Sequence, residues 1–144
     1  MPKLLKFVCN SCDLELTTWE NGVMYAIDKK GRRIEVQHPG ESYQVAKILR
    51  IDESEIFGFP YMRIPNPDLY PLLNERVGVI SDCLCLDCAE VSKLDFNLDE
   101  RKCHKCGTDN LVPVDNLARM ECPKCNKGVF EYQSCKNVLF ATQI

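Results

Sequence analysis

The chain has 144 residues, which suits one domain or two very small modules, and ten of these residues are cysteines. Its formal net charge is −3, and every site of four thiolates around a divalent metal ion would add −2. This balance disfavours a non-specific nucleic-acid binder, because such proteins need cations to displace the counterions of the phosphate backbone.

The N-terminal stretch, MPKLLKFVCNSCDLEL, has no apolar run of signal-peptide length and reaches a Cys-x-x-Cys pair at Cys9. No segment approaches the roughly 18 apolar residues that a membrane helix needs. We therefore expect a cytoplasmic protein with no membrane association. Thiols stay reduced there, so paired cysteines favour metal over disulfides.

Alternating apolar residues and turn signals predict strands in the N-terminal part of the chain, the last two forming a hairpin with Gly31 at its tip: 4–8, 13–19, 23–27 and 33–36. Val45, Ile48 and Leu49 then follow helical spacing, which predicts one short amphipathic helix over residues 42–51.

Four prolines within residues 57–73 predict an irregular packed segment, because proline disfavours helix interiors and central strands. A strand at 76–80 follows and leads into the cysteines. Residues 89–101 are predicted to be a connector. From Cys103 onward the pattern predicts a compact β unit with a strand at 128–133, and the apolar tail 137–144 is predicted to dock as a further strand.

Four Cys-x-x-Cys pairs are the strongest signal in the sequence. Two residues between cysteines let a tight turn point both sulfur atoms at one metal ion, so each pair supplies half of a tetrahedral site. Four pairs therefore predict two sites, with these metal ligands: Cys9, Cys12, Cys85, Cys88, Cys103, Cys106, Cys122 and Cys125.

Two pairings of the four units fit the spacing. The one we favour joins 103/106 with 122/125, which enclose 15 residues, a spacing typical of two-knuckle zinc sites. Cys9/Cys12 would then join Cys85/Cys88 across a long loop, whose closure costs entropy only logarithmically. The competing pairing joins 85/88 with 103/106 and leaves 9/12 with 122/125.

The stretch CHKCGTDNLVPVDNLARMECPKCNKGVFEY resembles the zinc-ribbon family with its rubredoxin-like knuckles, over about 30 residues. The resemblance implies a knuckle, a hairpin, a second knuckle and a strand. It departs at Asn126, where a glycine often follows the last cysteine. We expect a mainly β fold with one short helix and two zinc-ribbon-type modules: residues 1–98, with an inserted α+β region at 13–82, and residues 99–144.

Two structural zinc ions are the expected cofactors, because closed all-thiolate sites suit Zn²⁺; rubredoxin-type iron is the redox alternative. Cys83 and Cys135 have no Cys-x-x-Cys partner and are predicted to be buried apolar residues. Cys83 lies close enough to Cys85 to compete with it as a ligand. His104 should point to solvent within its knuckle.

The sequence favours a non-catalytic accessory module that binds a protein partner. No Ser-His-Asp set, phosphate-binding loop or open His-rich metal site is present in the sequence. His38 and Glu41 could transfer protons, but a polar loop is the favoured interpretation. The partner would meet the segment around 57–73, with these aromatic residues: Phe57, Phe59, Tyr61 and Tyr70.

Nucleic-acid binding is the alternative function. It would use the basic hairpin tip, with Trp19 or Tyr25 nearby for base stacking, combined into one face with four further cations. Acidic residues at 28 and 35 dilute this patch, so a solvated hairpin tip is favoured. The cations concerned are Lys29, Lys30, Arg32 and Arg33 at the tip, with Lys105, Arg119, Lys124 and Lys127.

Overall fold

The computed structural model describes residues 3–134, and the chain divides into two compact units. Within that range unit 1 comprises residues 3–22 and 81–134, and unit 2 comprises residues 23–80. Within the described range no helix combines the length and apolar character needed to cross a membrane. Cys135 and the predicted tail strand lie outside the described residues. The fold is mainly β with one main helix, as the sequence predicts.

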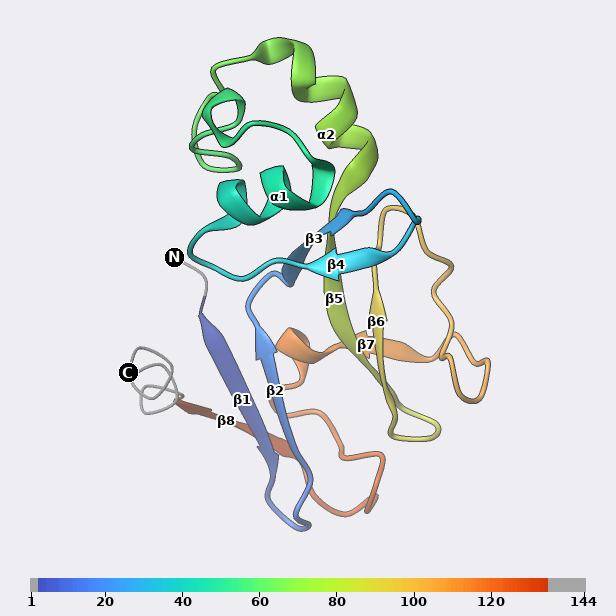
Figure 1. Ribbon diagram of the computed structural model, residues 1–144. Helices are drawn as coiled ribbons and strands as arrows, with labels where there is room; N and C mark the ends of the chain where they lie inside the picture. Colours follow the sequence, from blue (N-terminus) through green and yellow to red (C-terminus); the bar gives the residue numbers. More distant parts are fainter. Residues whose placement is uncertain (1–2, 135–144) are drawn as a thin grey trace. The chain divides into compact units, whose positions relative to one another are not determined.

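The first sheet of unit 1 is antiparallel, with β1 (Leu4–Cys9) in its centre. It lies between β2 (Glu15–Trp19) and β8 (Phe130–Ser134) (Figure 1). Three predicted strands are thereby confirmed. Alternate residues of β1 face a buried apolar cluster, whose fully or nearly fully buried members are Phe7, Cys9, Leu84, Val114, Leu117, Cys122 and Phe130.

The C-terminal part of β5 (Val77–Cys85) organises the rest of unit 1. It pairs with β6 (Val91–Leu94) and with β7 (Leu111–Pro113), which runs into the 3₁₀ helix η3 (Val114–Asn116). The prediction of a connector at 89–101 is therefore wrong. β6 was missed because its buried residue is Ser92, only 2% exposed, so the apolar alternation that marks a strand is absent.

Unit 2 is built around β3 (Val23–Ile27), which pairs with β4 (Arg33–Glu35) and with the first residues of β5. The helix α1 (Glu41–Leu49) packs against β3 (Figure 1), which confirms the predicted hairpin and helix. An apolar core without cysteine holds this unit together, with these buried members: Ala26, Val36, Val45, Ala46, Ile56, Ile64 and Leu73.

The proline-rich segment of unit 2 is more regular than predicted. After the 3₁₀ helix η1 (Glu53–Glu55) and a run of turns come η2 (Pro67–Leu69) and a second helix, α2 (Tyr70–Arg76). Pro71 lies in the first turn of α2, where a residue without an N–H loses no helical hydrogen bond. The prediction of irregular structure is thus wrong at its C-terminal end and agrees with the turns before Asn66.

Candidate metal centres

The thiols of the four Cys-x-x-Cys pairs gather into two groups, in each of which the sulfur atoms all lie within 4.8 Å of one another. Site A consists of Cys9, Cys12, Cys122 and Cys125. Site B consists of Cys85, Cys88, Cys103 and Cys106. The structure therefore has the competing pairing, and the pairing that we favoured from the sequence is wrong.

Strand pairing decides between the two alternatives. β7 does not form a hairpin of its own but pairs with β5, with Leu111 opposite Cys85, and this brings the two knuckles of site B together. β8 pairs with β1, with Phe130 opposite Cys9, and this does the same for site A. The predicted division between residues 98 and 99 depended on the pairing that the structure does not have.

Backbone hydrogen bonds give the four knuckles a common shape. The N–H of the first cysteine donates to the carbonyl of a residue five or six positions later: Cys9 to Leu14 (3.0 Å), Cys85 to Glu90 (2.9 Å), Cys103 to Thr108 (2.8 Å) and Cys122 to Gly128 (2.9 Å). In three knuckles the residue after the second cysteine has a positive φ: Ala89 (64°), Gly107 (76°) and Asn126 (56°). Asn126 thus occupies the usual glycine position, because asparagine tolerates this conformation.

Backbone N–H groups also point at the sulfur atoms. Lys105 N lies 3.4 Å from Cys103 Sγ, and Gly128 N lies 3.5 Å from Cys125 Sγ. Such donors stabilise a thiolate, and backbone hydrogen bonds lower the pKa of Cys103 and of Cys125 to about 6. One thiol in each site is therefore converted to a thiolate more readily than a free cysteine.

The opposite shift is found for one further thiol in each site. A backbone hydrogen bond lowers the pKa of Cys12 and of Cys88, but burial and the neighbouring thiols outweigh it and raise each value to about 12. Metal ligands are thiolates, so a bound cation has to displace these protons. Binding at either set of four cysteines therefore requires a metal ion that holds thiolates tightly enough to displace the protons of Cys12 and Cys88.

A lysine–carboxylate pair joins the two knuckles of each site. In site A Lys124 Nζ lies 3.2 Å from Asp13 Oδ1, and in site B Lys105 Nζ lies 3.0 Å from Glu90 Oε1. Each lysine immediately precedes the last cysteine of its site, so the sites repeat one design. These pairs are exposed, so they contribute little to stability. The ammonium group of each lysine nevertheless places a positive charge beside the four cysteines.

The two sites differ in their surroundings. In site A a Cβ atom added at Gly128 would lie 2.7 Å from Cys9 Sγ and 2.6 Å from Asn10 Oδ1, so the knuckles are in direct contact. In site B a Cβ atom added at Gly107 would meet nothing within 4 Å, and Cys106 is exposed. The knuckles of site A pack against each other and leave no cysteine fully exposed, whereas site B has one exposed cysteine.

Two further residues of unit 1, Cys83 and His104, lie beside site B and are not among its four cysteines. Cys83 is fully buried and packs in one cluster with Cys85, Cys103 and Leu111, which confirms the prediction for this thiol. Burial raises its pKa to about 11. His104 is exposed, as predicted, although its Nδ1 lies 2.6 Å from the hydroxyl of buried Ser92.

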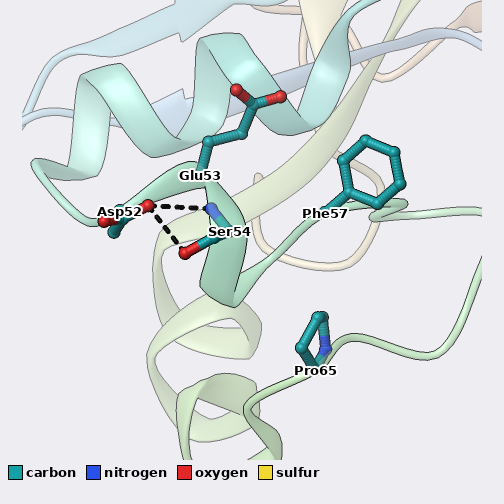
Figure 2. Close-up of a pocket in the computed structure, with 5 residues that line it drawn as sticks. All are labelled: Asp52, Glu53, Ser54, Phe57 and Pro65. Atoms are coloured by element: carbon teal, nitrogen blue, oxygen red, sulfur yellow. Dashed lines mark hydrogen bonds between the residues drawn. The ribbon is translucent and has the colours of Figure 1, made fainter.

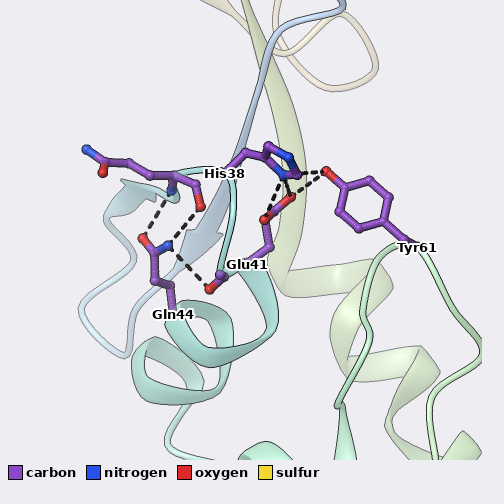
Figure 3. Close-up of polar contacts among 6 residues, drawn as sticks. His38, Glu41, Gln44 and Tyr61 are labelled. Atoms are coloured by element: carbon purple, nitrogen blue, oxygen red, sulfur yellow. Dashed lines mark hydrogen bonds and ion pairs between the residues drawn. The ribbon is translucent and has the colours of Figure 1, made fainter. Parts of the chain in front are cut away.

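A second polar cluster lies in unit 2, where His38 and Glu41 meet Tyr61 (Figure 3). The Glu41 carboxylate is 6% exposed; it accepts from the Tyr61 hydroxyl at 2.5 Å and pairs with His38 Nδ1 at 3.0 Å. Burial raises the pKa of Glu41, but the hydrogen bonds from Tyr61 and His38 outweigh it and lower the pKa overall. Tyr61 was predicted only as an aromatic residue of the partner-binding segment, and its contact with Glu41, 20 residues away, was not predicted.

This cluster ties a loop to the start of α1. Figure 3 also shows Gln44, whose side chain donates to the Gln37 carbonyl at 2.8 Å and accepts from the Gln37 N–H at 3.0 Å. The hydrogen bond to the Glu41 carboxylate raises the pKa of Tyr61 to about 12, so its hydroxyl stays a donor. These hydrogen bonds hold the loop before α1 against the helix, which agrees with the interpretation of His38 and Glu41 as part of a polar loop.

An open pocket of about 610 Å³ lies on unit 2, lined by Asp52, Glu53, Ser54, Phe57 and Pro65 (Figure 2). The Asp52 carboxylate accepts from the Ser54 N–H at 2.9 Å and from its hydroxyl at 2.8 Å, which caps η1. The ring of Phe57 is 60% exposed. The pocket therefore combines an exposed aromatic ring with carboxylates.

In comparisons with known proteins, no family model, no curated protein and no solved structure matches the chain significantly. The resemblance to zinc ribbons rests on the two groups of four cysteines and their turns, which are compatible with zinc-ribbon-like metal sites. These groups define the class of the molecule as a small protein with two candidate metal sites of four cysteines each.

Proposed function

We propose that the protein binds two structural zinc ions, one at each site, and acts as a non-catalytic module that binds another protein. The observation that carries the metal assignment is the gathering of eight thiols into two sets of four. Four sulfur ligands complete a tetrahedral zinc site and leave no open position for water or substrate. Zinc bound in this way stabilises a fold and does not perform catalysis.

Zinc is favoured over iron by the role that the sites have in the fold. Each site joins two separate knuckles of unit 1, so the ion serves as a crosslink, and a crosslink needs no change of oxidation state. Zn²⁺ has no redox chemistry and accepts tetrahedral thiolate ligands without geometric strain.

Elemental analysis of protein produced with both iron and zinc in the medium tests this assignment. We expect two zinc ions per chain and a colourless sample. A red sample that bleaches on reduction would identify rubredoxin-type iron instead. Fewer than two ions per chain would contradict the proposal for at least one site.

Exposed aromatic surface on unit 2 supports a protein partner. Phe57 and Tyr61 are 60% and 63% exposed, and Met62 is 58% exposed. Aromatic residues and methionine are enriched at protein interfaces, where they supply contact area at low entropic cost. The carboxylates of the pocket beside Phe57 would suit a partner segment that carries basic side chains.

A pull-down with a matched pair of variants tests the interaction. Phe57→Ser removes the ring of the pocket, and Leu98→Ser changes an equally exposed residue of unit 1. A partner that is retained by the wild type and by Leu98→Ser but is lost by Phe57→Ser would support the proposed surface. A partner lost by neither variant would place the interface elsewhere.

Nucleic-acid binding has weaker support, because two of the four cations of the hairpin tip already have partners. Arg32 Nε lies 2.9 Å from Asp28 Oδ2, and the Arg33 guanidinium lies 4.8 Å from the centre of the Tyr25 ring. A gel shift at low salt distinguishes this alternative, since phosphate contacts are strongest there. A shift that disappears on adding salt would favour nucleic acid over a protein partner.

A further inference from the structure

The last ligand of site B differs from the other thiols in its access to solvent. Cys106 is exposed, whereas the corresponding ligand of site A, Cys125, is half-buried, and so are Cys12 and Cys88. Among the cysteines that the structure describes, Cys106 alone is exposed. A thiolate reacts with dissolved reagents only when they can reach its sulfur atom.

The turn that follows Cys106 leaves the approach open. Gly107 has a φ of 76°, and the space where its side chain would be holds no atom within 4 Å. In site A, Gly128, three residues after Cys125, lies against Asn10 and Cys9 of the other knuckle. A small molecule therefore meets less protein around Cys106, which is exposed, than around Cys125, which is half-buried.

A second thiol lies within reach of Cys106. Cys85 Sγ is 3.6 Å from Cys106 Sγ, and Cys85 is fully buried on β5. A disulfide needs a sulfur–sulfur distance of about 2.05 Å, so the two sulfur atoms have to approach by about 1.5 Å. Reaction at Cys106 can therefore continue to a crosslink with Cys85.

We propose that Cys106 is a modification site for small peroxides, and that its oxidation ends in a Cys85–Cys106 disulfide that releases the site B metal. This proposal rests on the proposed zinc function. The Cys106 thiolate attacks one peroxide oxygen, which breaks the O–O bond, forms the sulfenic acid and releases hydroxide. The Cys85 thiolate then attacks the sulfenic sulfur, which forms the S–S bond and releases a second hydroxide. Both hydroxides take protons from solvent.

Electrons balance in this sequence, because the two thiolates lose two electrons and one peroxide gains two. The metal loses two of its four ligands, and a site with two thiolates binds zinc far more weakly than a complete one. Site A keeps all four ligands. Peroxide therefore converts a chain with two metal ions into a chain with one, and a dithiol reductant with added zinc restores the starting state.

The test uses the full chain loaded with two zinc ions and treated with hydrogen peroxide. A chromogenic zinc indicator follows release, and peptide mass mapping locates the disulfide. We expect one ion per chain to leave at least about tenfold faster than the other, since reactivity follows access to the thiolate. The disulfide should join Cys85 and Cys106.

Two variants at corresponding positions serve as a matched pair. Cys125→Ser disables site A, so the one ion of this variant, bound in site B, should leave in the fast phase. Cys106→Ser disables site B, so the one ion of this variant, bound in site A, should leave in the slow phase. If either variant fails to fold, the two phases and the mapped disulfide of the wild type still decide the question.

Several results would overturn the proposal. Equal release rates, or a first disulfide among the site A cysteines, would contradict the role of Cys106. A Cys103–Cys106 disulfide would contradict the role of Cys85. Two bound zinc ions that both resist peroxide would overturn this proposal and leave the proposed function intact, whereas a chain without zinc before treatment would overturn both.

Discussion

Units 1 and 2 solve the same problem of stability in different ways. Unit 2 contains no cysteine and buries an apolar core between a short sheet and its helices. In unit 1 many of the buried core residues are cysteines of the two sites. A small domain that cannot bury enough apolar surface commonly relies on metal. Metal dependence should therefore be confined to unit 1.

Metal removal should produce the largest effect, and this effect should differ between the two units. With a strong chelator we expect unit 1 to lose its structure, because each zinc site contributes on the order of 10 kcal/mol in isolated finger peptides. Hydrogen exchange would then show lost protection at Phe7 and Leu84 but retained protection at Ala26 and Val45. Simultaneous loss at all four amides would show that unit 2 cannot fold without unit 1.

Gly128→Ala should have the next largest effect. Its methyl group would lie 2.7 Å from Cys9 Sγ, so the knuckles of site A have to separate. We expect loss of one of two zinc ions by elemental analysis. Gly107→Ala is the control, because its methyl group meets nothing and only the positive φ opposes it, at a cost of about 1 kcal/mol. Retention of both ions in Gly128→Ala would contradict the close contact.

Tyr61→Phe should have a smaller effect, confined to unit 2. The loss of one hydrogen bond to Glu41 should lower the free energy of unfolding by about 0.5–1.5 kcal/mol, measured by denaturant titration at pH 7. Because the pKa of Glu41 is lowered in the folded protein, this stabilisation is present above the ordinary value of 4.5 and is lost as pH falls through the lower, folded value. The difference between wild type and variant should therefore shrink below pH 4.5.

Tyr43→Phe is the control for this substitution, since Tyr43 is also exposed, at 56%, whereas the carboxylate of Glu41 is hydrogen-bonded to His38 and Tyr61. A Tyr61→Phe protein as stable as wild type at pH 7 would show that the hydrogen bond from Tyr61 to Glu41 does not stabilise unit 2.

Replacing Lys29 and Lys30 by alanine should have the smallest effect. Both side chains lie at the exposed hairpin tip, so the free energy of unfolding should change by less than about 0.5 kcal/mol. Asp28→Ala sharpens the test, because its carboxylate accepts from the N–H groups of Lys30 and Arg32 at 2.9 Å. In thermal melts, the midpoint of Asp28→Ala should be clearly lower than that of the lysine variant. The reverse order would contradict the exposed, non-structural placement of the two lysines.

Local patterns in the sequence carried much of the fold. Alternation predicted β1, β2, β3 and β8, and the Cys-x-x-Cys spacing predicted eight thiols in two groups. The pairing of the knuckles could not be predicted in the same way, because both alternatives satisfy the spacing. Long-range pairing of β7 with β5 and of β8 with β1 decides it, and such contacts leave little trace in local sequence.

The other errors have local physical causes. α2 was missed because Pro71 marks a helix start as well as a helix break. β6 was missed because a buried serine, with a histidine beside its hydroxyl, occupies the inward position of the strand. The contact of Tyr61 with His38 and Glu41 was missed because nothing near these two residues in the sequence indicates a partner so distant along the chain.

The ligands of site B all lie within residues 85–106, whereas site A needs thiols from residues 9–12 and from residues 122–125. The chain leaves the ribosome N-terminus first, so all four thiols of site B emerge before the second half of site A does. By the same topology, one proteolytic cut in any loop of unit 2 would leave two fragments that a metal ion in site A still holds together.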